Sequence, residues 1–200
     1  MRDISADIKV TEINVRNALV RSSLPEADFV INPYVGCAHA CRYCYAEFMK
    51  RRREHDEPWG GFVDIKVNSP ELIRGELNGK ILLSSVTDPY QPIEEKYALT
   101  RKILEKLLPH QPELSILTKS GLVLRDLDLL KQFRNIRVGV TITALDEQAR
   151  QRFEPGASSV SERINVLKQL KSHNISSYVF IGPMLPHITD VNEIFSSLKH

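Results

Sequence analysis

Short segments of apolar residues along the chain alternate with longer stretches in which apolar residues recur every three or four positions. The short segments are typical of buried strands, and the longer stretches are typical of amphipathic helices. The segments that predict strands are residues 29–31, 62–67, 81–83, 114–117, 136–142 and 178–181. Strands that alternate with helices in this way predict parallel βαβ units, about five of them when the segment at 29–31 is included.

The stretches between these strands each show one apolar helical face. The predicted helices cover residues 43–53, 99–108, 123–133, 159–170 and 190–198. The fourth helix has a clear start, because Ser159 is followed three residues later by Glu162, the pair that forms a capping box. Residues 6–20 alternate more weakly and predict an edge strand or an extended lead-in to the fold.

The number of units decides between a closed and an open barrel. A closed eight-unit barrel typically needs about 250 residues, and this chain has 200. We therefore expect an α/β fold with a partial or open barrel. The chain stops at His200, directly after a predicted helix, which is typical of an unfinished unit.

The carboxyl ends of the predicted strands carry polar or glycine-containing segments. In parallel α/β folds the ligand site lies at this edge of the sheet. The segments concerned are the loop around residues 37–44 and residues 84–90, 118–120, 141–143 and 182–184. We expect all five to face one mouth.

Composition and charge narrow the setting of this site. Lys and Arg number 27 and Asp and Glu 25, which gives a net charge of +2. This balance permits a nucleic-acid partner without requiring one. No apolar run reaches the roughly 18 residues of a membrane span, and the N-terminus lacks the apolar core of a signal peptide. We expect a cytoplasmic protein with no membrane partner.

All three cysteines of the chain, Cys37, Cys41 and Cys44, lie within eight positions in the spacing C-x3-C-x2-C. No cysteine is left to pair at a distance, which argues against a disulfide framework and favours reduced thiols that bind a metal. Thiolates select zinc, copper(I) or iron–sulfur centres. Three thiolates leave one coordination position open, which is typical of a reactive rather than a structural site. Gly36 permits the turn that leads into the loop.

Two other interpretations of the cysteine loop remain open at this point. His39 is the nearby residue that could complete a Cys3His zinc site, and the basic run at residues 50–53 could then offer a nucleic-acid surface. The same run is also typical of a solvated helix end, because cations are favoured there by the helix dipole. A protein that keeps an iron–sulfur cluster only as a scaffold or an electron relay is the other alternative.

The sequence around the cysteines also resembles a known family. The cysteine spacing, an aromatic residue before the last cysteine, a preceding strand and the βα units that follow resemble the radical S-adenosylmethionine (radical SAM) enzymes. Four wider motifs are similar to the spore photoproduct lyase-like branch of that superfamily. They are NPYVGCAHACRYCYA at 32–46, SVTDPYQPIE at 85–94, TKS at 118–120 and FEP at 153–155.

This resemblance implies a partial (β/α)6 barrel that carries a [4Fe-4S] cluster on Cys37, Cys41 and Cys44. It also implies that S-adenosylmethionine chelates the remaining iron and is cleaved reductively to methionine and a 5′-deoxyadenosyl radical. A cluster that must be reduced implies an electron donor of the ferredoxin or flavodoxin type. Residues 29–200 would form the core domain, and residues 1–28 an N-terminal extension. The substrate is not implied.

The resemblance also implies cofactor contacts. Tyr43 and Tyr45 would flank the adenosine or the methionine of S-adenosylmethionine. Ser85, Lys119 and Thr143 would contact the amino-acid part and the ribose of this cofactor. A lysine suits this place because the methionyl carboxylate is an anion. One departure concerns the reaction: spore photoproduct lyase uses a further cysteine as a hydrogen donor, and this chain has none outside the cysteine loop.

Overall fold

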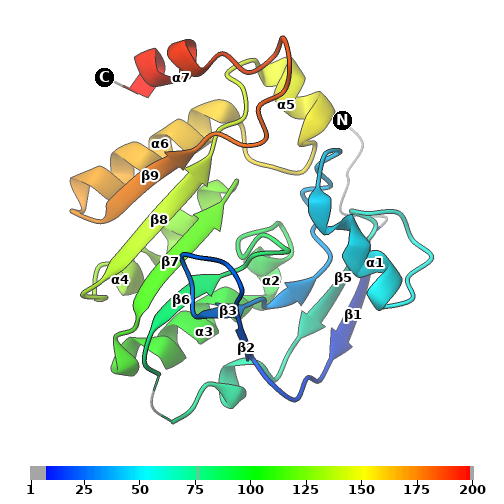
Figure 1. Cartoon of the computed structure of the whole chain (residues 1–200), viewed down its shortest axis with the longest axis vertical. Helices are drawn as coiled ribbons and strands as arrows, with labels where there is room; N and C mark the ends of the chain where they lie inside the picture. The colour runs from blue at the N-terminus through cyan, green and yellow to red at the C-terminus, as the bar shows by residue number, and fades with distance from the viewer. Residues whose placement is uncertain (1–7, 76, 199–200) are drawn as a thin grey trace.

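The structure, a computed structural model, describes residues 8–75 and 77–198 (Figure 1). Its strands are β1 (Lys9–Ile13), β2 (Leu19–Arg21), β3 (Phe29–Ile31), β4 (Tyr34–Val35), β5 (Phe62–Lys66), β6 (Lys80–Leu83), β7 (Glu113–Thr118), β8 (Ile136–Thr141) and β9 (Ser176–Phe180). Its α-helices are α1 (Phe48–Arg52), α2 (Glu94–Tyr97), α3 (Leu99–Leu107), α4 (Leu127–Leu130), α5 (Glu147–Phe153), α6 (Val160–Ser172) and α7 (Val191–Leu198).

The main sheet has six strands in the order β2-β3-β6-β7-β8-β9. Strands β3, β6, β7, β8 and β9 are parallel to one another, and only β2 runs antiparallel, against β3. Each parallel strand lies next to the one that follows it in this series, as expected for successive right-handed βα units. The predicted α/β fold with a partial barrel of about five units is confirmed.

A second, smaller sheet has the order β1-β5-β4. Strand β1 pairs parallel with β5, and the two-residue strand β4 pairs antiparallel with β5 directly before the cysteine loop. The segment at 62–67 is therefore a strand, as predicted, but it belongs to this sheet rather than to the barrel series. The division at residue 28 stays a prediction: residues 1–7 lie outside the described residues, and β1 and β2 each join one of the two sheets.

The core fills the space between the main sheet and the helices behind it (Figure 1). Strand residues such as Leu83, Ile116 and Val138 are completely buried, as are Ile103 of α3 and Val166 of α6. Ser159 caps α6 with its side chain, and Glu162 completes the predicted capping box.

Four helical segments differ from the prediction, and the first is the short helix α2, which was not predicted. The predicted helix at 43–53 is shorter, because Cys44 keeps an extended backbone and only α1 is α-helical. The one at 123–133 starts as a 3-10 helix over Gly121–Asp126, followed by the short α4. Helix α5 was not predicted, although Asp146 accepts a hydrogen bond from the backbone N–H of Gln148 (2.8 Å) and is an N-cap signal readable in the sequence.

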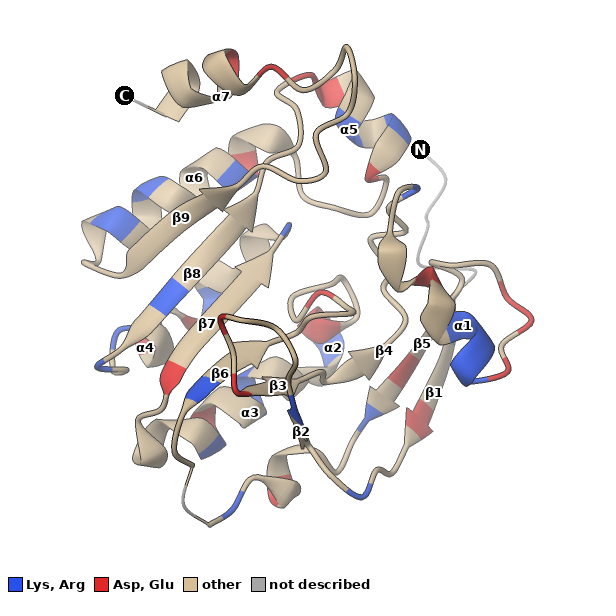
Figure 2. Ribbon diagram, in the orientation of Figure 1, with Lys and Arg blue, Asp and Glu red and all other residues tan. Residues whose placement is uncertain are grey.

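Positive charge is concentrated on helix α1. Helix α1 carries the basic run next to the cysteine loop and lies at the outer edge of the molecule (Figure 2). Among the described residues, no helix has both the length and the apolar character needed to cross a membrane.

Candidate functional site

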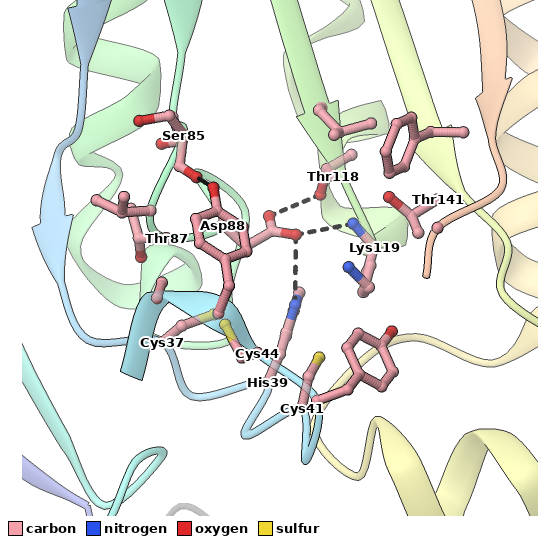
Figure 3. A pocket seen from close by; sticks show the side chains of 18 of the residues that line it. Cys37, His39, Cys41, Cys44, Ser85, Thr87, Asp88, Thr118, Lys119 and Thr141 are labelled. Atoms are coloured by element: carbon pink, nitrogen blue, oxygen red, sulfur yellow. Dashed lines mark hydrogen bonds and ion pairs between the residues drawn. The ribbon is translucent and has the colours of Figure 1, made fainter. Parts of the chain in front are cut away.

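A cavity of about 440 Å³ lies at the carboxyl edge of the main sheet, within the size range of small-molecule sites. Its lining comes from the cysteine loop and from the segments that follow β6, β7, β8 and β9 (Figure 3). The expectation that five separate segments face one mouth is therefore confirmed. Most of the exposed lining area is apolar, and the charged lining residues are Asp88 and Lys119.

The three thiols line one side of this cavity. Cys37 and Cys41 are buried, and Cys44 is half-buried. Burial raises the pKa of the Cys41 thiol to about 12, although the nearby Lys119 ammonium acts in the opposite direction. Burial likewise raises the pKa of the Cys37 and Cys44 thiols. Since only thiolates bind soft metals, binding of a metal centre here releases protons.

The segment after β6 holds the cysteine loop by direct contacts. The backbone N–H groups of Ser85 and Val86 donate to Asn32 Oδ1 at 2.9 and 3.2 Å. The backbone N–H of Ala38 donates to Gln91 Oε1 at 2.8 Å. Gln91 Nε2 in turn donates to the Gly36 carbonyl at 3.3 Å. The two longest motifs of the sequence, at 32–46 and 85–94, therefore form one interface. The second motif holds the cysteine loop of the first in place.

Asp88 joins this interface to the end of β7. Its Oδ1 accepts a hydrogen bond from Thr118 Oγ1 (2.7 Å), and its Oδ2 accepts one from the Lys119 backbone N–H (2.8 Å). His39 Nδ1 lies 3.3 Å from the same Oδ2 (Figure 3). Burial alone would raise the pKa of the Asp88 carboxyl, but His39, Thr118 and Lys119 bring it below its usual value. His39 thus serves as an anchor of the loop within the fold.

Gly36 allows the turn into the loop, as predicted. It has φ +86°, and a Cβ there would overlap the carbonyl oxygen of Phe62 on β5. Both the backbone conformation and the close approach therefore require glycine.

We expect Gly36→Ala to lower the free energy of unfolding by about 3 kcal/mol, because left-handed strain and a backbone overlap add together. Gly75→Ala is the matched control, since Gly75 has φ +81° and a Cβ there would meet no atom of the described residues within 4 Å. It should lose only the strain, about 1–2 kcal/mol. Urea unfolding of both variants measures the difference, and equal losses would show that Phe62 does not restrict this position.

The predicted cofactor contacts come together at the cavity with one exception. Tyr43, Tyr45, Ser85 and Lys119 line it. Tyr45 is 70% exposed at the rim, and its hydroxyl donates to the Ser85 carbonyl. Thr143 is buried outside the lining, where its hydroxyl meets the Tyr43 hydroxyl at 3.2 Å. A contact between Thr143 and a cofactor stays a prediction.

A segment that follows α5 closes over the cysteine loop from the other side. The backbone N–H of Arg42 donates to the Phe153 carbonyl (2.9 Å), and the N–H of Gly156 donates to the His39 carbonyl (3.0 Å). A Cβ on Gly156 would overlap the Ala38 carbonyl. The motif at 153–155 signalled this segment in the sequence, but not its contact with the loop.

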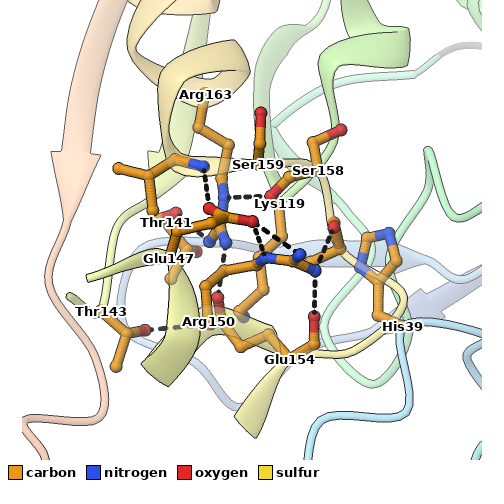
Figure 4. Close-up of polar contacts among 12 residues, drawn as sticks. His39, Lys119, Thr141, Thr143, Glu147, Arg150, Glu154, Ser158, Ser159 and Arg163 are labelled. Atoms are coloured by element: carbon orange, nitrogen blue, oxygen red, sulfur yellow. Dashed lines mark hydrogen bonds and ion pairs between the residues drawn. The ribbon is translucent and has the colours of Figure 1, made fainter. Parts of the chain in front are cut away.

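Sequence reasoning found Glu154 only as part of the motif at 153–155, and it missed the partner of Glu154, Arg163. The Tyr43 hydroxyl donates to Glu154 Oε1, and Arg163 Nη2 donates to Glu154 Oε2 at 2.6 Å (Figure 4). Burial by itself would raise the pKa of Glu154, but Arg163 and then Lys119 bring it below its usual value. A Glu and an Arg nine positions apart give no local pattern, so only the fold reveals the pair.

The sequence profile of the Radical SAM superfamily matches residues 31–197. The chain belongs to the radical SAM superfamily. This match spans the cysteine loop and every strand end that lines the cavity. The resemblance to the radical SAM enzymes that the sequence suggested is thereby confirmed.

Two relatives of known sequence are similar to most of this chain, and one of them has a radical SAM name. The chain is 42% identical over 197 residues to an uncharacterized protein of Methanocaldococcus jannaschii, covering 98% of this chain and 75% of the relative. It is 24% identical over 192 residues to a radical SAM Nalpha-GlyT isomerase of Pseudomonas phage M6, covering 92% of this chain and 39% of that enzyme.

The fold is that of spore photoproduct lyase, as the resemblance implied. One solved structure, a lyase variant with bound AdoMet and dinucleoside spore photoproduct, matches with a TM-score of 0.76 at 18% identity. The match covers 98% of this chain and 58% of the lyase. This radical SAM chain therefore spans little more than half of that structural relative.

The donor set around the thiols suits an iron–sulfur cluster, because three soft sulfur donors line one side of an open cavity. Zinc holds its ligands at about 2.3 Å for sulfur and about 2.0 Å for nitrogen, so they must converge on one point. Among the described residues, no three His, Cys, Asp or Glu side chains do so. Cluster cysteines each bind a different iron and stand farther apart. The indole Nε1 of Trp59 is buried without a hydrogen-bond partner among the described residues. Trp59 also lowers the pKa of the Cys44 thiol, although burial has the larger, opposite effect.

Proposed function

We propose that this chain is the core of a radical SAM enzyme that holds a [4Fe-4S] cluster on Cys37, Cys41 and Cys44 and cleaves S-adenosylmethionine reductively. One observation carries the proposal: the three cysteines of the chain line a cavity that the ends of four parallel strands, β6, β7, β8 and β9, help to build. When bound, the reduced cluster supplies the electron that converts S-adenosylmethionine into methionine and a 5′-deoxyadenosyl radical.

The residues of the chain supply binding, orientation and exclusion of water. Lys119 offers a half-buried ammonium for the methionyl carboxylate, and Ser85 lies across the cavity from it. The rings of Tyr43 and Tyr45 offer surfaces for the adenosine. Ser84 lines the same cavity and has a buried hydroxyl without a partner among the described residues, so we add it to the candidate cofactor contacts.

For the substrate, we propose a nucleic acid or a nucleoside derivative. The solved lyase with a similar fold binds a dinucleoside spore photoproduct. Two aromatic side chains at the rim, Tyr45 and Phe180, are 70% and 46% exposed and could stack on bases. The basic run of α1 offers cations for phosphates (Figure 2). Repair through a cysteine hydrogen donor is not part of the proposal, because this chain has no cysteine outside residues 37–44.

The test is direct. Protein purified and reconstituted without oxygen should be brown, should contain the iron and sulfide of one cluster per chain, and should release 5′-deoxyadenosine when given dithionite and S-adenosylmethionine. Dithionite here replaces the ferredoxin- or flavodoxin-type donor that we propose as a partner. Colourless protein with one bound zinc would contradict the proposal. Brown protein that yields no 5′-deoxyadenosine would favour a scaffold or an electron relay.

A further inference from the structure

Lys119 is a cation that no described carboxylate holds in an ion pair. Its ammonium lines the cavity, and among the described residues it has neither a hydrogen-bond partner nor an ion pair. The nearest feature is the ring of Tyr43, whose centroid lies 5.8 Å from Nζ. A half-buried cation held in this way is poised for an anionic ligand, because an opposite charge is what it lacks.

The carboxylate that could occupy Lys119 from within the protein is Glu154. It lies under the same tyrosine, where its Oε1 accepts hydrogen bonds from the Tyr43 hydroxyl and from Thr143 Oγ1 (3.1 Å). Lys119 is close enough to favour the ionised form of Glu154, yet the two form no ion pair. Something else must therefore satisfy the second oxygen of Glu154.

Arg163 does so. It is 1% exposed, and its guanidinium donates to Glu154 Oε2 at 2.6 Å. The same guanidinium donates to the carbonyls of Thr141 and Ser158, both at 3.0 Å, which fixes it to the end of β8 and to the start of α6 (Figure 4). Glu154 and Arg163 are thus a buried, hydrogen-bonded pair with no net charge, and Glu154 contacts Tyr43, which lines the cavity.

We infer that Arg163 neutralises Glu154 and thereby keeps Lys119 available for an anion in the cavity. Arg163 and Glu154 are positioning residues. Arg163 acts on the ligand through Glu154 and Lys119, and neither Arg163 nor Glu154 need touch the ligand. This inference rests on the proposed function, in which Lys119 binds the methionyl carboxylate. Without Arg163, the free oxygen of Glu154 would compete with that carboxylate for Lys119.

The experiment compares two ligands on cluster-reconstituted protein at pH 8, by equilibrium dialysis. S-adenosylmethionine carries the carboxylate, whereas 5′-methylthioadenosine keeps the adenosine and lacks it. Arg163→Gln should weaken binding of S-adenosylmethionine about ten-fold, the size of one close charge interaction at a half-buried site. Binding of 5′-methylthioadenosine should not change. The change that S-adenosylmethionine causes in the electron paramagnetic resonance spectrum of the reduced cluster gives a second readout.

A second substitution separates charge from structure. Adding Glu154→Gln to Arg163→Gln removes the competing carboxylate, so the double variant should bind S-adenosylmethionine within about three-fold of wild type. Arg150→Gln is the matched control: Arg150 is buried in the same segment and donates to the carbonyls of Glu154, Pro155 and Ala157, but not to the Glu154 carboxylate. Glu154→Gln should not restore any affinity that Arg150→Gln loses.

The outcomes are distinct. If Lys119→Met leaves the affinity for S-adenosylmethionine unchanged, the proposed role of Lys119 is wrong and this inference falls with it. If Lys119→Met weakens binding but Glu154→Gln fails to restore Arg163→Gln, the inference alone is wrong. A parallel loss of 5′-methylthioadenosine binding would show a structural role and also overturn it. Should Arg163→Gln not fold, Arg163→Lys keeps the charge and should retain the affinity; a ten-fold loss there would count against the inference.

Discussion

Replacing Cys41 by alanine is expected to abolish the release of 5′-deoxyadenosine completely. Cys41 is the central cysteine of the loop, and this chain contains no other thiol that could take its place. Two cysteines leave a cluster with too few protein ligands to hold it, since iron–sulfur clusters depend on thiolate ligation. The measurement is the yield of 5′-deoxyadenosine with dithionite, alongside the iron and sulfide content of the variant.

His39→Gln is the control that separates a cluster from a zinc site. In a Cys3His zinc site His39 would be a ligand, and its replacement would release the metal. In the structure His39 instead faces Asp88, and a glutamine can still donate to that carboxylate. We therefore expect His39→Gln to keep its iron and sulfide. Loss of the metal from both variants alike would favour the zinc interpretation.

The sequence predicted the barrel well because buried strands and amphipathic helices leave strong local patterns. The runs at 81–83, 114–117 and 136–142 are flanked by helices with one apolar face, and all became neighbouring parallel strands. The smaller sheet was not predictable in the same way. Its strand β4 is two residues long, and the pairing of β5 with β1 joins segments about fifty positions apart without any local signal.

The candidate site divides along the same line. The cysteines, Lys119 and the other strand-end residues could be found because parallel folds gather their strand ends on one edge. The residues that hold them could not, because their partners are distant in the sequence. The Asp88–His39 contact spans 49 positions, and Glu154 meets Tyr43 across 111. The motif SVTDPYQPIE at 85–94 could be recognised in the sequence, but its role could not. The structure shows that this motif holds the cysteine-loop motif at 32–46.

The strongest case of this mutual support is Glu94, the last residue of that motif. It is fully buried, and four groups donate to its carboxylate: the Tyr34 hydroxyl, the backbone N–H groups of Thr100 (2.9 Å) and Arg101 (3.4 Å), and Arg125 Nη2 (2.6 Å). Tyr34 belongs to β4, directly before the cysteine loop. Glu94 therefore ties the loop to the first helices of the barrel.

We expect Glu94→Leu to destabilise the protein by about 3–5 kcal/mol, the cost of leaving a buried charge partner and several donors without their acceptor. A loss of this size is a large part of the stability of a typical domain, so the variant should also retain less cluster on reconstitution. Urea unfolding and iron content are the measurements.

Glu95→Leu is the matched control, because Glu95 is the next residue, lies in the same helix α2 and is exposed. Its replacement should change the free energy of unfolding by no more than about 0.5 kcal/mol. A milder change, Glu94→Gln, keeps one acceptor oxygen for Tyr34 but places an amide N–H₂ or a single neutral oxygen against Arg125. The free energy of unfolding that Glu94→Gln loses should therefore lie between the losses of Glu95→Leu and Glu94→Leu. If Glu94→Leu and Glu95→Leu were equally stable, the buried carboxylate would have no role in fixing the cysteine loop, and the other contacts of the loop, among them those of Asp88 and Gln91, would hold it without Glu94.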